Sequence, residues 1–321
     1  MKSHERFRLR LSVSDKTEGR SVVVFAFIAN VVVAIAKTVA AVLTGSSSMR
    51  TEAVHSWVDV GNEGFVVAAT RAARRSADEL HPMGYGRASY VWSMFASIGT
   101  LAGGAVVGVW QGIRQLSEPE GGGHYAIGYV VLAVSFLLEG GSFVQTLRQT
   151  RKDADKFGRG LFEYVLATSN SPLRAVFAED LTALIALVAA ALGMLLHQLT
   201  GSPVYDAIGS IVIGVLMAIA AVIMISGNAR YLSGRSLDPT ERAQVLALIR
   251  ALPEVSRVTF LYTEFIGPLR YVIMAGVGIA GDHGQAELAT ILRTLERKLM
   301  QQEYVGLVIM TLATADDADL E

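Results

Sequence analysis

The segment from Thr51 to Ala73 is rich in apolar residues, yet it carries ionisable side chains at helical spacing. His55, Asp59 and Glu63 are spaced four residues apart, and Glu52 precedes His55 by three. In a helix these four side chains point to nearly one side. Because a charged group at the centre of a bilayer costs several kcal/mol, such residues normally face a bundle interior or a water-filled path. The pattern therefore predicts an ion site inside a bundle of membrane helices.

A solvated turn between two apolar segments is the alternative interpretation of this stretch. Its only helix-weakening residues are Gly61 and Gly64, and no proline occurs between Ser47 and Leu80. Apolar residues also continue through residues 66–69 before the arginines that follow. These features favour a continuous helix over a turn.

The composition of the whole chain indicates a membrane protein. Of its 321 residues, 52% are hydrophobic and only 18% are charged, far from the usual balance of soluble domains. The formal net charge of −1 provides no basic excess, so nucleic-acid binding is not expected. Because there is no cysteine, disulfides and thiolate metal sites are excluded, and histidine, aspartate and glutamate remain as metal ligands.

Six segments are long and apolar enough to cross a hydrocarbon core about 30 Å thick as helices. They are approximately Val22–Thr44, Thr51–Ala73, Tyr90–Ile113, Ala126–Thr146, Ala175–Leu199 and Tyr205–Gly227. Lysine and arginine are concentrated before the first segment, between the second and third, and between the fourth and fifth. By the positive-inside rule both termini of this multi-pass protein lie in the cytoplasm, and the short basic N-terminus fits the inner membrane of a bacterial cell.

The chain is predicted to have four parts: a cytoplasmic N-terminal segment (1–20), a six-helix transmembrane domain (21–232), a cytoplasmic domain (233–314) and an acidic tail (315–321). In the cytoplasmic domain, Asp238 and Pro239 are typical of the start of a helix. Two strands, a second helix and a third strand follow, which makes an αββαβ, ferredoxin-like α+β unit with both helices on one face of the sheet. The acidic tail is interpreted as disordered and not as a metal site.

Ionisable residues near the middle of the predicted spans lie in three of the six segments. They are His55, Asp59 and Glu63 in the second, Glu139 in the fourth, and Glu179 and Asp180 in the fifth, with Asp206 near the start of the sixth. The first and third segments are interpreted as apolar scaffolding. Because carboxylates and an imidazole are too costly to leave unpaired at this depth, we expect the second and fifth helices to meet around a divalent cation.

His55, Asp59 and Asp180 would supply one nitrogen and two oxygen donors. This is close to the mixed tetrahedral set that suits Zn²⁺ and leaves a position open for exchange. Only neutral His55 is a ligand, so metal binding must displace a proton. The alternative is that the buried acids form hydrogen-bonded pairs that hold the bundle together, an interpretation that applies most directly to Glu139.

Three motifs in the chain resemble those of the cation diffusion facilitator family. The second segment reads Glu52-Ala-Val-His55-Ser-Trp-Val-Asp59, the loop after it reads His81-Pro-Met-Gly-Tyr-Gly-Arg87, and Gly201-Ser-Pro-Val-Tyr-Asp206 leads into the sixth segment. The resemblance implies a dimeric exporter of divalent metal with six membrane helices and a cytoplasmic αββαβ domain. It also implies that the pair four residues apart in the second helix binds the metal.

Within the family the chain is most similar to the zinc transporter 9 subgroup, through Glu139-Gly140, Ala178-Glu179-Asp180 and Gly234-Arg-Ser236. Family members commonly have a histidine four residues before the aspartate of the fifth helix. Here Asp180 matches that aspartate, but Val176 occupies the histidine position. The fourth donor is therefore left open between Glu179, Glu139 and water, and oxygen-rich coordination would admit Mn²⁺, Fe²⁺ or Co²⁺ beside Zn²⁺.

The sequence as a whole predicts a homodimeric secondary transporter, not an enzyme, that exports a divalent metal in exchange for protons by alternating access. The predicted ligands are His55, Asp59 and Asp180, with Glu179 and Glu139 as further candidates. An intramembrane metalloenzyme is disfavoured because the chain has no His-Glu-x-x-His motif and no cysteine. A membrane scaffold or sensor with structural acids is the remaining alternative, and a regulatory metal at His283 is a further hypothesis.

Overall fold

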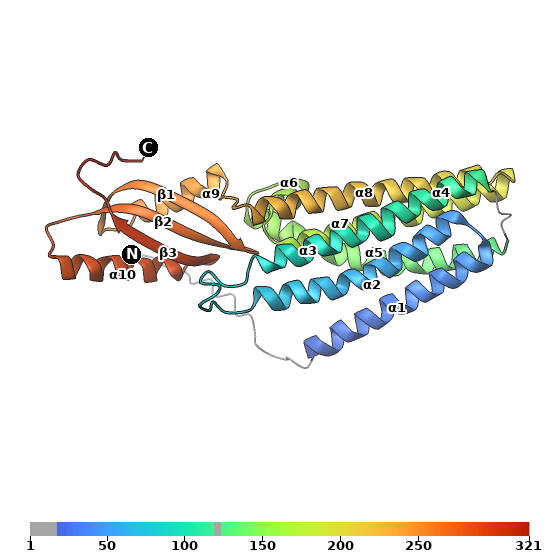
Figure 1. Ribbon diagram of the computed structural model, residues 1–321, viewed down its shortest axis with the longest axis horizontal. Helices are drawn as coiled ribbons and strands as arrows, with labels where there is room; N and C mark the ends of the chain where they lie inside the picture. The colour runs from blue at the N-terminus through green and yellow to red at the C-terminus, as the bar shows by residue number, and fades with distance from the viewer. Residues whose placement is uncertain (1–17, 119–122, 321) are drawn as a thin grey trace.

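The computed structural model describes residues 18–118 and 123–320. A bundle of long helices forms one part of the elongated molecule, and a small domain built on a β-sheet lies at one end of the bundle (Figure 1). Most of the predicted N-terminal segment, residues 1–17, falls outside the described residues. The bundle therefore has an end that adjoins the sheet domain and a far end that does not.

The helices of the bundle run back and forth between these two ends (Figure 1). In chain order they are α1 (Glu18–Thr44), α2 (Ser47–Ala73), α3 (Ala88–Gly99), the π-helical η1 (Thr100–Val106), α4 (Val107–Ser117), α5 (Tyr125–Lys156), the short α6 (Leu161–Ala167), α7 (Ser171–Thr200) and α8 (Val204–Leu232). The segments α3, η1 and α4 follow one another without a break and form a single rod.

Within the described residues, five helical segments are long and apolar enough to cross a membrane. They are Phe27–Thr44, Ala88–Ser117, Tyr125–Lys156, Ser171–Thr200 and Val204–Leu232. The remaining long helix, α2, is 27 residues long, as α1 is, but its ionisable side chains make it less apolar. It lies within the bundle in contact with α1, α3, α7 and α8. The arrangement fits the predicted six-helix membrane domain, with α2 as the polar helix that the others shield.

Glycines bring the rod of α3, η1 and α4 close to α8. A Cβ on Gly112 would lie 2.7 Å from the carbonyl oxygen of Ala207, and a Cβ on Gly214 would lie 2.7 Å from the amide nitrogen of Val109. Contacts this short leave no room for a larger side chain, as is common where membrane helices pack through small residues. Short π-helical segments such as η1 occur frequently at functional sites.

Asp206, at the start of α8, holds the turn between α1 and α2 at the far end of the bundle. Its buried carboxylate accepts hydrogen bonds from the Ser46 hydroxyl at 2.7 Å, the Ser47 amide at 2.6 Å and the Ser48 hydroxyl. Ser46 in turn caps α2 by accepting a hydrogen bond from the amide of Met49. Asp206 therefore has structural partners, and it determines where α2 begins beside α8.

The Asp206→Ala variant is expected to be destabilised by about 3 kcal/mol, because several buried donors at the start of α2 would lose their acceptor. Thermal unfolding of the purified protein in detergent would show this as a lower melting temperature. Asp155→Ala, at an exposed position near the end of α5, is the matched control and should melt like the parent protein. Equal melting temperatures for the two variants would contradict the structural role of Asp206.

The small domain has the predicted order of elements: α9 (Pro239–Arg250), β1 (Val255–Gly267), β2 (Arg270–Ile279), α10 (Gln285–Met300) and β3 (Val305–Leu312). Strand β2 is central, antiparallel to β1 and parallel to β3. One core cluster joins Ile249 of α9 and Leu295 of α10 to Ile273 of β2, so both helices cover the same face. These observations confirm the predicted αββαβ fold.

The described part of the acidic tail is packed against β1, which contradicts the expectation of disorder. The amide of Leu320 donates to the carbonyl oxygen of Val258 at 2.8 Å, and the carboxylate of Asp319 accepts from the amide of Val258 at 3.2 Å. The side chain of Leu320 also packs against the domain core. An apolar residue among the acids therefore holds the tail in place, a contact that charge composition does not indicate.

The loop between α2 and α3 contacts the sheet domain. A Cβ on Gly86 would lie 2.8 Å from the Cα of Gly267, at the tip of the β1–β2 hairpin, so the two backbones touch. The next residue, Arg87, forms an ion pair with Glu264 of β1. The Gly-Arg pair of the loop motif thus docks the hairpin onto the start of α3 (Figure 1).

Candidate metal centre

A small cavity of about 50 Å³ lies inside the bundle, between α2, α3, α7 and α8. Helix α2 contributes His55, Asp59 and Asn62 to its wall, η1 contributes Thr100, and α7 contributes Glu179. The other residues of the wall are uncharged and mostly small. The ionisable side chains of the cavity therefore come from the second and fifth predicted spans.

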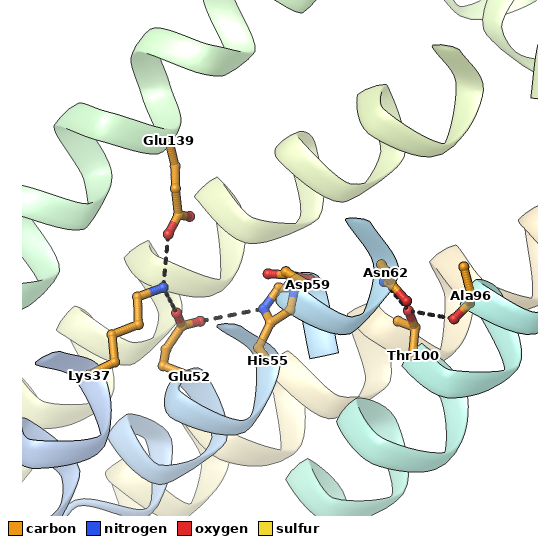
Figure 2. Close-up of polar contacts among 8 residues, drawn as sticks. All are labelled: Lys37, Glu52, His55, Asp59, Asn62, Ala96, Thr100 and Glu139. Carbon is orange, nitrogen blue, oxygen red and sulfur yellow. Dashed lines mark hydrogen bonds and ion pairs between the residues drawn. The ribbon is translucent and has the colours of Figure 1, made fainter. Parts of the chain in front are cut away.

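His55 is buried in the bundle, with only 3% of its surface exposed. Its Nε2 atom lies 3.5 Å from Oδ1 of Asp59, one turn further along α2, and its Nδ1 atom lies 3.9 Å from Oε1 of Glu52, one turn earlier (Figure 2). The helical spacing of the motif accounts for this placement of the imidazole between two carboxylates. Each ring nitrogen thus points to an acid that can orient the ring or share a cation with it.

Glu179 approaches α2 from α7 and lines the same cavity as Asp59 and Asn62. Asn62 also donates to the hydroxyl of Thr100 at 3.0 Å, which links α2 to the π-helical segment (Figure 2). Asp59 and Glu179 are thus the two acids through which α2 and α7 meet at the cavity.

Asp180 faces a different helix, although it is next to Glu179 in sequence. Its Oδ2 atom accepts hydrogen bonds from Thr146 at 2.9 Å and Ser142 at 3.5 Å, both on α5. Consecutive residues of a helix point about 100° apart, so Glu179 and Asp180 cannot both face α2 in one orientation of α7. The structure brings His55, Asp59 and Glu179 together and directs Asp180 to α5, and a ligand role for Asp180 stays a prediction.

Glu139 of α5 belongs to a buried ion cluster that the sequence analysis did not identify. The Nζ atom of Lys37, on α1, lies 2.9 Å from Oε1 of Glu139 and 3.0 Å from Oε2 of Glu52 (Figure 2). Only 1% of Lys37 is exposed. The interpretation of the first span as apolar scaffolding was therefore wrong, because Lys37 pairs with two acids. A single lysine within an apolar span indicates a buried acidic partner.

Two other predicted residues lie apart from the cavity. Glu63 accepts a hydrogen bond from Asn30 of α1. In the small domain, His283 Nε2 lies 2.9 Å from the carbonyl oxygen of Ala280, and Nδ1 lies 3.2 Å from Oε1 of Glu287. These contacts, the one to Ala280 first, raise the pKa of His283 above its usual value. A raised pKa favours the protonated imidazole, which does not bind metal, so this geometry gives no support to a regulatory site there.

Within residues 18–118 and 123–320, no three histidine, aspartate or glutamate side chains converge closely enough to hold a metal ion. His55, Asp59 and Glu179 instead surround a cavity from two helices. These side chains would have to rotate toward an ion to bind it with the short bonds that a metal requires. The donor side chains therefore line the cavity but are not arranged in coordination geometry.

The fold and this cavity together define a polytopic membrane protein with imidazole and carboxyl groups inside its helix bundle. Residues 23–233 match the family model of the cation efflux transmembrane domain. The chain therefore belongs to the cation efflux family, which confirms the resemblance to cation diffusion facilitators that the motifs indicated.

Comparison with curated proteins identifies relatives of the same kind. The chain is 30% identical over 239 residues to metal tolerance protein C4 of Arabidopsis thaliana, covering 74% of this chain and 52% of that protein. It is 28% identical over 286 residues to the mitochondrial proton-coupled zinc antiporter SLC30A9 of Xenopus laevis, covering 88% and 49%. The putative transporter MamV of Paramagnetospirillum magneticum is 28% identical over 109 residues, covering 34% and 31%. The chain spans about half the length of the first two relatives.

Proposed function

We propose that the protein exports a divalent metal ion, Zn²⁺ first, in exchange for protons. The observation that carries the proposal is the placement of His55 and Asp59 of α2 and Glu179 of α7 on the wall of one cavity within the bundle. One nitrogen and two oxygen donors suit Zn²⁺ and leave a position open for exchange. The similarity to proteins named as a proton-coupled zinc antiporter and a metal tolerance protein supports the same function.

Coupling to protons follows from the chemistry of these donors. His55, Asp59 and Glu179 line one cavity, and carboxyl groups and an imidazole bind a metal only in their unprotonated forms. An arriving cation must therefore displace protons from the site. Because uncompensated charge inside a membrane is costly, losing protons as the metal binds keeps the charge of the bundle nearly constant. Metal binding and proton release are then parts of one event.

The identity of the metal depends on which acids complete the coordination shell. Asp180 and Glu139 lie on the faces of α7 and α5 that meet each other, and Asp180 would reach the cavity only if α7 turned. A shell richer in oxygen than the one around His55 would suit Mn²⁺, Fe²⁺ or Co²⁺ better. Zn²⁺ is the proposed substrate because the imidazole is the donor that the structure places on the cavity wall.

Alternating access would expose the cavity in turn to the two sides of the membrane as the bundle rocks. The small domain would hold two protomers together in an isologous dimer through the sheet face that its own helices leave uncovered. On that face Phe260, Tyr262 and Ile309 are exposed. The basic loops lie at the end of the bundle that adjoins the small domain, and by the positive-inside rule they support a cytoplasmic location for that end. The proposed location is the inner membrane of a bacterial cell.

Zn²⁺ uptake by proteoliposomes containing the purified protein tests this function. Uptake is expected to accelerate when the liposomes are more acidic inside than outside, and a protonophore should abolish the acceleration. Repeating the measurement with Mn²⁺, Fe²⁺ and Co²⁺ in the same preparation identifies the preferred metal. Absence of uptake for all four metals would contradict the transporter, and uptake that ignores the proton gradient would contradict antiport.

A further inference from the structure

A lysine and two glutamates form a buried cluster next to the proposed metal site. Nζ of Lys37 lies 3.0 Å from Oε2 of Glu52 and 2.9 Å from Oε1 of Glu139, and the three residues come from α1, α2 and α5 (Figure 2). Lys37 is 1% exposed and Glu52 is completely buried. One ammonium group therefore serves two carboxyl groups, and Glu52 also faces the imidazole of His55.

Glu52 connects this cluster to the metal site through its two oxygens. Its Oε2 atom is held by Lys37, whereas its Oε1 atom lies 3.9 Å from Nδ1 of His55 and has no hydrogen-bond partner in the described part of the chain. A fully buried carboxylate oxygen without a donor is costly, and native proteins rarely leave one. This oxygen faces the imidazole without a hydrogen bond, so a cation held between Glu52 and His55 would satisfy it.

We propose that Glu52 is a ligand of the transported metal and that Lys37 competes with the metal for it. The proposal rests on the proposed transport function of the cavity beside His55. A metal ion between His55 and Glu52 would share one carboxylate with the ammonium group, and two cations at this distance repel each other. Metal binding then moves Lys37 toward Glu139, and the return of Lys37 to Glu52 favours release of the metal.

Lys37 would act as a tethered cation that limits how tightly the metal is held. Transport requires the ion to leave as well as to bind, and a buried site with unopposed acids would retain a divalent cation. Glu52 lies between His55 and the start of α2 at the far end of the bundle. The competing ammonium group would therefore stand beside a metal that moves from the cavity toward that end.

A purely structural ion cluster that ties α1 to α2 and α5 is the competing explanation. In both explanations, loss of Lys37 destabilises the bundle, because removing one partner leaves buried charges unpaired. The two explanations differ in metal affinity. A structural cluster has no reason to change Zn²⁺ affinity in a way that depends on Glu52.

Zn²⁺ titration calorimetry on the purified full-length protein in detergent separates these explanations. Lys37→Gln is expected to tighten Zn²⁺ binding about tenfold, because the competing charge is gone. In the Glu52→Gln background the same substitution should leave the affinity unchanged. Lys152→Gln, at an exposed position of α5, removes the same charge and is the matched control. An unchanged or weaker affinity for Lys37→Gln, or a gain that persists without Glu52, would overturn the proposal.

If the Lys37→Gln variant does not fold, the Glu139→Gln variant tests the same competition. This variant retains the ion pair between Lys37 and Glu52. Lys37 then has Glu52 as its sole acidic partner in the cluster, and Zn²⁺ binding should weaken about tenfold. This loss should disappear in the Glu52→Gln background, and a loss that persists there would overturn the proposal by making Glu139 itself a ligand. A parent protein that binds no Zn²⁺ refutes the proposed function, whereas normal parent binding without coupling between these residues refutes only the competition.

Discussion

Proteoliposomes that contain the His55→Ala variant are expected to take up Zn²⁺ about 100-fold more slowly than those with the parent protein. The substitution removes the nitrogen donor on the wall of the cavity and leaves Asp59 and Glu179. Two carboxyl groups without an imidazole are a poorer donor set for a borderline-soft ion such as Zn²⁺. A Zn²⁺ indicator and a pH indicator inside the same liposomes measure both fluxes, and both should fall together.

His197→Ala is the matched control for this experiment. His197 is also buried, with 5% of its surface exposed, but it lies near the far end of α7, where its ring centre is 5.7 Å from that of Tyr125. Its loss should leave the Zn²⁺ flux unchanged once the amounts of folded protein are matched by size-exclusion chromatography. A folded His55→Ala protein that transports as fast as His197→Ala would exclude a metal site at His55.

Glu179→Gln is expected to reduce Zn²⁺ flux about 100-fold, whereas Asp180→Asn should reduce it less than about tenfold. Glu179 lies on the cavity beside Asp59, while Asp180 is hydrogen-bonded to Thr146 on α5. Each amide is close in size to the acid that it replaces, so the comparison tests charge and not packing. Because Glu179→Gln also removes a carboxyl group that could exchange its proton for the metal, the remaining flux should depend less on the proton gradient.

The opposite order of effects would carry a specific structural meaning. A larger loss at Asp180 would contradict the metal-site role of Glu179 and would require α7 to turn until Asp180 faces α2. Equal losses at both positions would mean that the two acids bind the ion in different conformations of the transport cycle. Zn²⁺ affinities of the two variants, measured alongside flux, distinguish a lost ligand from a slowed conformational change.

Much of the fold was predictable because it depends on local patterns. Long apolar segments and basic loops identify the helices of the bundle without any knowledge of their contacts. The span of α2 was predicted from the same apolar pattern, although its ionisable residues make it less apolar than the other spans. Capping residues such as Asp238 and the strand pattern likewise predicted the small domain. The packing of Leu320 on β1 was missed because it joins segments distant in sequence.

The candidate metal centre was predictable only in part, because some of its contacts join residues that are distant in sequence. His55 and Asp59 are one turn apart on one helix, so their proximity follows from helical geometry. The choice between Glu179 and Asp180 depends on the rotation of α7, which packing against its neighbours determines. The contact of Glu139 with Lys37 joins residues 102 positions apart, and no local pattern pairs them.

The sequence by itself determined the class of this protein, its helices and small domain, and the presence of a histidine–aspartate pair within a membrane helix. These features follow from hydropathy and from interactions between near neighbours along the chain. Only the tertiary structure decided which acids face that pair, where Lys37 finds its partners and how the hairpin docks on the loop before α3. Those contacts depend on how whole helices rotate and pack, and this is set by the sum of interactions across the bundle and not by any single segment.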